Sequence, residues 1–348
     1  MTAAKRLGFV GVGNMGQCAH LLNYTDLEGC EVVALAEVRP DLAARVAARY
    51  GVPKVYADHR QMLAAEALDG IVAAQPFSRH GVLLPELYDT GIPVLSEKPL
   101  ARSVQVGQEL VAAGGVHVLG YHKRSDPAVL HAVERIRQLR QSAELGPMRY
   151  VRILMPGGDW IASGFTHLVQ SSEAVPPLEA DPPAPDMDET TARAYESLVN
   201  FYIHQINLMR HLMGESYRIS FADRQGVLLA TESESGIVGA IEMSPYRTSI
   251  DWQERVLVAF ERGYLEIDLP APLASNRPGR VREYADPGDG KTPLASEPQL
   301  PWVGAMRQQA THFVQLLHGE STCLCRAPEA LEDLEVAREA VLMKGQHQ

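Results

Sequence analysis

The chain of 348 residues is poor in cysteine, in basic residues and in long apolar runs. Its four cysteines form no pair of C-x-x-C motifs and have no histidine at a zinc-binding spacing, so we expect no metal site and read them as small buried thiols. The 32 Lys and Arg residues against 43 Asp and Glu residues give a formal net charge of -11, which argues against nucleic-acid binding. The first residues hold no long apolar stretch, so we predict neither a signal peptide nor a membrane span and expect a cytoplasmic protein.

The length is that of a two-domain protein, and 46% hydrophobic residues are enough to pack both domains. In the first third, short apolar runs alternate with helical patterns, which predicts a doubly wound parallel sheet. The runs that we assign to strands lie at residues 7–10, 32–36, 69–74, 93–96 and 116–120. We therefore assign residues 1–121 to a dinucleotide-binding Rossmann domain of the α/β class.

Beyond residue 121 the pattern becomes that of an α+β domain with a largely antiparallel open sheet, which we assign to residues 122–348. Strand patterns follow one another at spacings typical of a meander, and a Pro-rich and Gly-rich excursion precedes two final helices. The predicted elements are a helix at 127–141, a strand at 148–155, one long helix at 191–213, strands at 236–243, 255–260 and 264–269, and the excursion at 270–301.

The first predicted strand runs directly into the motif G-x-G-x-x-G, and a helical pattern follows. In this arrangement Gly11 permits a tight turn, Gly13 lets the backbone approach a pyrophosphate, and Gly16 allows close packing of helix on strand. The phosphates then lie at the N-terminus of the helix, which favours negative charge. The motif predicts a dinucleotide site that includes Gly11, Gly13, Asn14, Met15 and Gly16.

The second predicted strand ends at Glu37, close to where a carboxylate binds the hydroxyls of the adenosine ribose. A carboxylate accepts hydrogen bonds from a free 2'-hydroxyl and repels a 2'-phosphate, which favours NAD over NADP. Arg39 leaves NADP open, because its guanidinium can pair with a phosphate or stack on adenine.

An acidic, proline-rich insertion separates the first strand of the second domain from its long helix, at about residues 156–190. Its residues 173–189 hold six acids, five prolines and no Lys or Arg. One interpretation is a solvated loop. The other is a lid that faces the substrate and offers carboxylates to a cationic molecule.

Two sets of polar residues are candidates for the chemistry. Lys98 follows a predicted strand at the carboxyl edge of the sheet, where the nicotinamide half of a cofactor would lie. Asn200, His204 and Asn207 are spaced i, i+4 and i+7 in the long helix, which would place them on one face.

With these residues the chain resembles the Gfo/Idh/MocA oxidoreductases, which act mostly on sugars, cyclitols and their derivatives. The markers are the glycine loop, Gln75-Pro76 with His80, the E-K-P element at 97–99, the segment 120–124, and the helix around His204. The resemblance implies a Rossmann domain followed by a domain whose open sheet commonly forms subunit interfaces, so we expect a homodimer or homotetramer. It also implies that Gln75, Pro76, His80, Glu97 and Lys98 contact the cofactor, with Lys98 and His204 near the point of hydride transfer.

The helix departs from the family pattern, because Asn200 and Asn207 stand where the family commonly has Asp, and Tyr202 where Gly is usual. Asn cannot stabilise an imidazolium by charge. A histidine titrates near neutral pH, whereas a lysine needs a pKa depression of about 3 units. We therefore assign His204 as general acid/base and Lys98 as the donor to the developing alkoxide, with the reverse assignment left open.

The resemblance implies an NAD-dependent dehydrogenase or reductase that interconverts a secondary alcohol and a ketone on a sugar, amino sugar or cyclitol. Because the protein is acidic and members of the family oxidise aminoglycoside intermediates in antibiotic biosynthesis, a cationic amino sugar is also considered. Alternatives are a non-catalytic NAD-binding regulator and an NAD-dependent glycoside hydrolase. Aromatic and donor groups suit hydroxylated rings, and the candidate substrate residues are Tyr121, His122, Lys123, Trp160, Asn200 and Tyr202.

Overall fold

The computed structural model describes residues 3–345 and divides into two compact units. The first unit comprises the chain up to Tyr121 together with Ser163–Asp186 and Met306–Leu334, and the second comprises the remaining segments. The division thus differs from the contiguous second domain predicted at 122–348, because two later segments return to the first unit. Residues 1–2 and 346–348, which the predicted boundaries include, lie outside the described residues.

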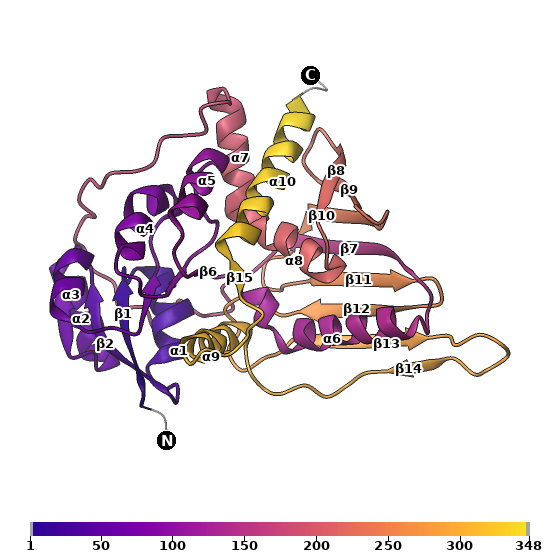
Figure 1. Cartoon of the computed structure of the whole chain (residues 1–348), viewed down its shortest axis with the longest axis horizontal. Coiled ribbons are helices and arrows are strands. Elements are labelled where there is room, and N and C mark those ends of the chain that lie inside the picture. Colours follow the sequence, from indigo (N-terminus) through magenta and orange to yellow (C-terminus); the bar gives the residue numbers. More distant parts are fainter. Residues whose placement is uncertain (1–2, 346–348) are drawn as a thin grey trace. The chain divides into compact units, whose positions relative to one another are not determined.

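The first unit is built on a sheet with the strand order β15-β6-β5-β4-β1-β2-β3 (Figure 1). All pairings are parallel except that of β15 with β6, so the doubly wound sheet predicted from the alternating pattern is confirmed. The order reverses between β1 and β4, which is the point where such sheets bind ligands. The strands are β1 (Lys5–Val10), β2 (Cys30–Ala36), β3 (Lys54–Tyr56), β4 (Gly70–Ala73), β5 (Val94–Ser96), β6 (His117–Leu119) and β15 (Cys325–Arg326).

The helices of this unit have clear start and stop signals. The helix α2 (Pro40–Tyr50) begins with Pro40 in its first turn and ends before Gly51, whose φ of 69° is left-handed. The side chain of Ser103 caps the N-terminus of α5 (Val104–Ala113) by accepting a hydrogen bond from the N–H of Val106. In chain order the elements are η1 (Gly16–Leu21), α1 (Leu22–Tyr24), α2 (Pro40–Tyr50), α3 (His59–Ala65), η2 (Phe77–Arg79), α4 (His80–Tyr88), α5 (Val104–Ala113), α9 (Ala305–Leu317) and the first part of α10 (Ala327–Gly345).

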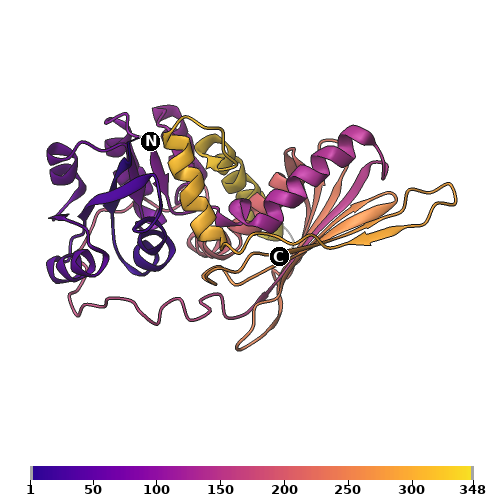
Figure 2. The same cartoon turned by 90° about the horizontal axis from the view of Figure 1, so that it is seen from below.

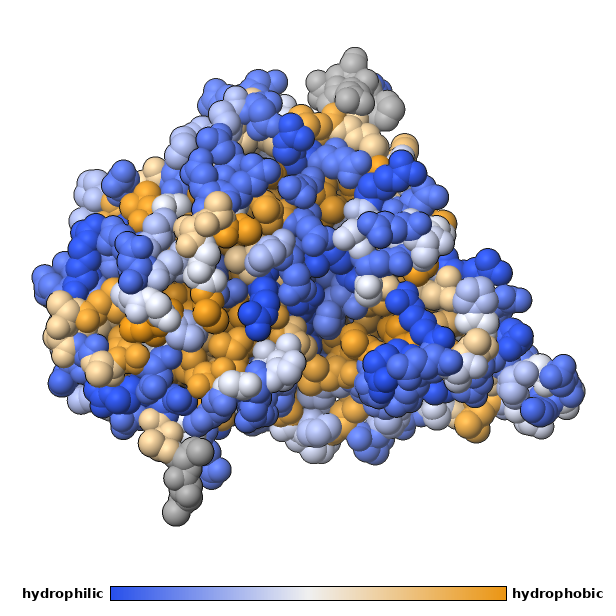
Figure 3. All heavy atoms as spheres, in the orientation of Figure 1, coloured by the Kyte–Doolittle hydropathy of each residue, from blue (hydrophilic) through white to orange (hydrophobic). Residues whose placement is uncertain are grey.

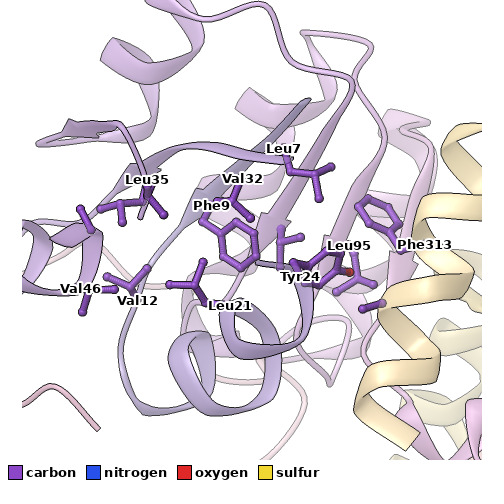
Figure 4. Close-up of a cluster of buried hydrophobic side chains, with 14 of the residues drawn as sticks. Leu7, Phe9, Val12, Leu21, Tyr24, Val32, Leu35, Val46, Leu95 and Phe313 are labelled. Atoms are coloured by element: carbon purple, nitrogen blue, oxygen red, sulfur yellow. The ribbon is translucent and has the colours of Figure 1, made fainter. Parts of the chain in front are cut away.

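The core of the first unit joins β1 and β2 to helices from both ends of the chain (Figure 4). The ring of Tyr24 packs edge-on against Phe9 at 5.6 Å between centroids and against Phe313 at 6.5 Å. Phe313 lies in α9, so this helix contributes to the core of the first unit although the second unit's residues 122–162 and 187–305 precede it in the chain. The core therefore explains why α9 belongs to the first unit.

The second unit contains a sheet with the order β14-β13-β12-β11-β7-β10-β9-β8, in which only the pairing of β7 with β10 is parallel. The predicted α+β class with a largely antiparallel sheet is confirmed. The excursion predicted at 270–301 contributes β13 and β14 to this sheet. The strands are β7 (Met148–Gly157), β8 (Tyr217–Ala222), β9 (Leu228–Ser233), β10 (Val238–Arg247), β11 (Glu254–Phe260), β12 (Gly263–Leu269), β13 (Arg280–Ala285) and β14 (Leu294–Ser296).

Helices cover one face of this sheet, with α6 (Pro127–Ser142) along β12 and β13, as Figure 2 shows, and α8 (Ile203–Met213) on β7 and β10. The outer side of α6 is hydrophilic (Figure 3). A short turn, η3 (His122–Ser125), leads into α6, which Asp126 caps by accepting the N–H of Ala128 at 2.8 Å. Within residues 3–345, no helix has the length and apolar character needed to cross a membrane.

The prediction of one long helix at 191–213 is wrong, because the structure has two helices there, α7 (Glu189–Phe201) and α8. Tyr202 lies between them with φ of -116° and ψ of 2°, outside the helical region. Its hydroxyl donates to Ser244 Oγ on β10 at 2.6 Å, a tertiary hydrogen bond that no helical periodicity reveals.

Candidate functional site

The glycine loop after β1 has the geometry that a dinucleotide site needs. Gly11 has a φ of 89°, and a Cβ there would lie 2.7 Å from the backbone oxygen of Ala74 and against Gln75 Nε2, so both conformation and space require glycine. A Cβ on Gly16 would lie 2.5 Å from the carbonyl oxygen of Gly11, which keeps η1 close to the strand. At Gly13 the nearest atom to such a Cβ is Arg39 Nη2 at 3.8 Å, so this side of the loop has room for a phosphate. Asn14 is exposed and Met15 half-buried at the start of the helix.

Glu37 lies at the end of β2 beside the glycine loop, and only 6% of it is exposed. Its Oε2 accepts the backbone N–H of Val12 at 3.1 Å. Arg39 donates to both carboxylate oxygens, through Nε at 2.8 Å and through Nη2 at 3.2 Å. The hydrogen bond to Glu37 raises the pKa of Arg39 above its ordinary value, and the charge of Glu173 adds to the shift. The carboxylate is thus held where a ribose hydroxyl can donate to it.

The segment after β4 carries three predicted cofactor residues in different surroundings. Gln75 lies against Gly11 and its Oε1 accepts from Arg79 Nη1 at 3.1 Å, while Pro76 is exposed. His80 is fully buried and its Nδ1 donates to the carbonyl of Leu100 at 3.0 Å. Burial lowers the pKa of His80, which keeps the ring neutral. The imidazole thereby ties α4 to the segment that follows the E-K-P element.

Glu97 and Lys98 follow β5 at the carboxyl edge of the parallel sheet, the edge where ligands bind in this fold. Oε2 of Glu97 accepts the backbone N–H of Lys98 at 3.2 Å, and Oε1 lies 2.7 Å from Nε2 of His20. Burial by itself would raise the pKa of Glu97, but the hydrogen bond and charge of His20, with the charge of Lys98, lower it below its usual value. Glu97 is therefore an anion that positions two neighbouring groups.

His20 is a site residue that the sequence analysis missed. It lies in η1 and is 1% exposed. A titratable residue on the otherwise apolar face of the helix after a glycine loop is the signal that could have drawn attention to it. Its partner is distant in sequence, so only the fold reveals the pair.

In the second unit, His204 is half-buried in the first turn of α8 and its ring lies 4.6 Å from that of His122, edge to face. Asn200, His204 and Asn207 do not lie in one uninterrupted helix as predicted, because Asn200 belongs to α7 and the other two belong to α8. Asn200 is exposed near the end of α7, and Asn207 is buried in α8, because the backbone breaks between the two helices at Tyr202. The structure thus brings the ring of His204 against that of His122.

Lys123 belongs to a buried cluster that the sequence analysis also missed. Its Nζ lies 2.5 Å from Oε2 of Glu254, and their side chains are 5% and 0% exposed. Glu254 also accepts from Gln205 Nε2 at 2.7 Å and from Trp252 Nε1 at 3.3 Å. The charge of Lys123 is thus paired inside the second unit.

The two remaining substrate candidates differ in exposure. Trp160 lies in the second unit and is 38% exposed, so its ring is accessible to a ligand. Tyr121 closes the first segment of the first unit and is 2% exposed.

Most acids of the 173–189 segment have local structural roles, which corrects the expectation that together they face the substrate. Glu173 accepts the N–H of Leu42, and Asp181 is buried and accepts the N–H of Gly81 at 2.9 Å, both within the first unit. Asp188 caps α7, and Glu189 pairs with Arg193 four residues on. The physical reason is that backbone N–H groups at the starts of helices attract carboxylates.

Comparisons with known proteins agree with this architecture. Residues 5–114 match the model of an oxidoreductase family with an NAD-binding Rossmann fold. Inositol 2-dehydrogenase of Corynebacterium glutamicum strain R is 24% identical over 312 residues, which cover 82% of this chain and 81% of that protein. An oxidoreductase from Desulfitobacterium hafniense, named as NADPH-dependent, superposes with a TM-score of 0.77 at 14% identity, covering 100% of this chain and 97% of the other.

Levoglucosan dehydrogenase, solved in complex with NADH and levoglucosan, superposes with a TM-score of 0.72 at 18% identity, covering 99% of this chain and 98% of the other. The glycine loop, the strand order and the matched family model lead to one conclusion. The first unit of this chain is an NAD-binding Rossmann fold, and its residues 5–114 match the model of the GFO_IDH_MocA oxidoreductase family.

Proposed function

We propose that the protein is an NAD-dependent dehydrogenase or reductase that interconverts a secondary alcohol and a ketone on a sugar or cyclitol. The observation that carries the proposal is Lys98 beside an ionised Glu97 at the ligand-binding edge of a Rossmann sheet. The similarity to inositol 2-dehydrogenase and to levoglucosan dehydrogenase supports a hydroxylated ring as substrate.

The residues of the first unit fit a dinucleotide. The open side of Gly13 offers room for the pyrophosphate, Glu37 offers a carboxylate to the adenosine ribose, and Gln75 adjoins the turn. Relatives with this fold are named or solved with either nicotinamide cofactor, so the preference depends on residues such as Glu37 rather than on the fold. When bound, NAD supplies the acceptor for a hydride from the carbon that is oxidised.

The chain's own residues must handle the hydroxyl proton. We assign His204 as the group that takes the proton from the alcohol or returns it to the ketone, and Lys98 as the donor that stabilises an alkoxide. The reverse, with Lys98 as base, is the alternative, and the absence of an Asp four residues before His204 favours it. Glu97 balances the charge of Lys98 when Lys98 is the cationic donor.

The substrate class is tested by following NADH formation by the full chain. The panel contains cyclitols, anhydrosugars, neutral sugars and amino sugars, each offered with NAD⁺, and the ketones offered with NADH. Turnover of a neutral polyol that disappears in Lys98→Met supports the proposal. Binding of NAD without turnover of any member in either direction would contradict it and indicate a non-catalytic regulator. Turnover without added NAD would indicate a glycoside hydrolase with retained cofactor.

A cationic amino sugar, such as an aminoglycoside-type intermediate of antibiotic biosynthesis, is the second candidate. The net charge of -11 favours it, because a negative surface attracts a cation. Glu173, Asp181 and Asp188 accept backbone N–H groups, which leaves fewer carboxylates of this segment to attract a cation. A lower KM for the amino sugar than for the matched neutral sugar, with a difference that fades in high salt, distinguishes this candidate.

We also propose that the protein assembles as a homodimer or homotetramer through the open sheet of the second unit. The sheet face opposite α6 and α8 carries charged side chains that pair across strands, such as Arg152 with Glu242 at 2.6 Å and Arg282 with Asp268 at 2.7 Å. Light scattering on the purified chain measures the oligomeric state. Arg152→Glu should weaken a subunit contact on this face.

A further inference from the structure

The segment 163–186 returns to the first unit and follows the ligand-binding edge of its sheet. Near its start, Val169 and Gln17 exchange hydrogen bonds of 2.9 and 3.0 Å at the helix after the glycine loop. Farther along, Asp181 is fixed beside α4 by the N–H of Gly81. We call this segment the strap. Between these two anchors it crosses the N-terminus of α2, next to the end of β2.

At this crossing Glu173 supplies a cap that α2 otherwise lacks. The N-cap residue, Arg39, makes no side-chain cap, and the first helical residue is Pro40, which has no N–H to offer. Oε2 of Glu173 accepts the N–H of Leu42 at 3.1 Å and the hydroxyl of Ser171 at 3.2 Å. A carboxylate at a helix N-terminus is also favoured by the dipole. Glu173 is therefore fixed at this point.

Two groups near the end of β2 could otherwise bind a 2'-phosphate. One is the guanidinium of Arg39, since an Arg close to this strand end accommodates the phosphate in NADP-dependent Rossmann domains. The other is the N-terminus of α2, since helix N-termini bind anions. In this chain Glu37 accepts hydrogen bonds from the guanidinium of Arg39. Glu173 accepts the N–H of Leu42 at the N-terminus of α2. The hydrogen bond to Glu37 is the main cause of the raised pKa of Arg39, and the charge of Glu173 raises it further.

We infer that Glu173, delivered by the strap, is a second determinant of cofactor choice that acts with Glu37 to exclude the 2'-phosphate of NADP. The inference rests on the proposed NAD-dependent function and goes beyond it, because it assigns specificity to a residue outside the first 121 residues. A 2'-phosphate at this place would meet the carboxylates of both Glu37 and Glu173, whereas a 2'-hydroxyl would donate to Glu37.

The test is isothermal titration of the full chain with NAD⁺ and with NADP⁺, which reports binding without turnover. Glu173→Gln removes the charge and keeps an oxygen that can accept the N–H of Leu42. We expect the ratio Kd(NADP⁺)/Kd(NAD⁺) to fall by about 3-fold to 10-fold, as expected for loss of a partly screened charge repulsion. Glu173→Lys should lower the ratio further. The matched control is Glu28→Gln, an exposed acid just before β2, at the opposite edge of the sheet.

The inference is overturned if the ratio in both Glu173 variants stays within about twofold of the unmodified chain's ratio. So small a change in the ratio corresponds to a free energy no larger than about the thermal energy. An equal fall in Glu28→Gln would also overturn it, since that result reports only the net charge of the domain. Melting temperatures of the variants without cofactor show whether the strap remains folded. Tighter binding of NADP⁺ than of NAD⁺ by the unmodified chain refutes the NAD assignment itself, whereas a strong NAD⁺ preference that both Glu173 variants retain refutes only the role of Glu173.

Discussion

Nε2 of His20 lies 2.7 Å from Oε1 of Glu97, although the two residues are 77 positions apart in the chain. The imidazole is 1% exposed and the carboxylate 12%, so neither group has much access to water. The pair joins the helix after the glycine loop to the strand end that carries Lys98. It therefore links the cofactor loop to the candidate catalytic lysine within one unit.

Replacing His20 should destabilise the first unit. His20→Ala leaves the Glu97 carboxylate without its imidazole partner, and we expect the free energy of unfolding to fall by about 1 to 3 kcal/mol. His20→Gln keeps a donor and should lose less. Urea unfolding measures the difference. The control is His59→Ala, whose more exposed pair with Glu86 should contribute only about 0 to 1 kcal/mol, and equal losses at both sites would contradict this prediction.

Substitutions at two glycines of the loop should have different effects, one on cofactor binding and the other on folding. Gly13→Ala adds a methyl group with no atom closer than 3.8 Å, so the melting temperature without cofactor should stay close to that of the unmodified protein while NAD affinity falls. Gly11→Ala places its Cβ 2.7 Å from the backbone oxygen of Ala74 at a φ of 89° and should lower the melting temperature itself. Calorimetry with and without NAD checks both. Unchanged NAD affinity in Gly13→Ala would remove the assigned phosphate approach.

Lys98→Met should lower kcat by at least about 100-fold and leave the Kd for NAD nearly unchanged. The reason is that methionine retains the length of the side chain but has no cation to stabilise an alkoxide. Stopped-flow measurement of the hydride-transfer step, together with equilibrium binding, separates the two effects. Near-normal turnover would exclude the role given to Lys98.

His204→Ala should also lower kcat by at least about 100-fold, because the reaction loses its assigned proton acceptor. Added imidazole should restore part of the rate if the missing group acts as a base. His122→Phe, which keeps a ring beside position 204, serves as the packing control because the two imidazoles lie 4.6 Å apart. No loss of rate in His204→Ala would leave Lys98 as the base.

Stability should decrease in mild acid because of His117. Its ring lies 2.8 Å from both Tyr88 Oη and Ser96 Oγ, and burial lowers its pKa from 6.5 to about 3. Below about pH 6.5 the unfolded chain binds a proton that the folded chain does not, so this contribution to stability is complete above that pH and is lost toward pH 3.

The measurement for His117 is the free energy of unfolding at about pH 7 and about pH 5. His117→Gln should reduce the loss between these conditions by about 2 kcal/mol, whatever its effect at neutral pH. A substitution of the exposed His167 is the control. An unaltered pH dependence in His117→Gln would show that other groups cause the acid sensitivity.

Local patterns in the sequence are sufficient to predict the central strands and the glycine turn of the first unit. Apolar runs ending at Val10 and Ala36 predicted parallel strands because buried strands need continuous apolar residues. The glycine motif predicted the turn because Gly11 requires a positive φ and Gly16 a close approach, and both requirements act on neighbouring residues. The placement of Glu37 and Lys98 at strand ends follows from the same periodicity.

The tertiary structure alone decided the contacts between distant segments. The division of the predicted helix at Tyr202 accompanies a hydrogen bond to Ser244, and the ion pair of Lys123 depends on Glu254, 131 residues away. The acids of the strap were recognised by composition, but the capping of α2 by Glu173 requires the chain to return to the first unit. Periodicity reports which face of a segment is buried, whereas the identity of its partner depends on how the whole chain packs.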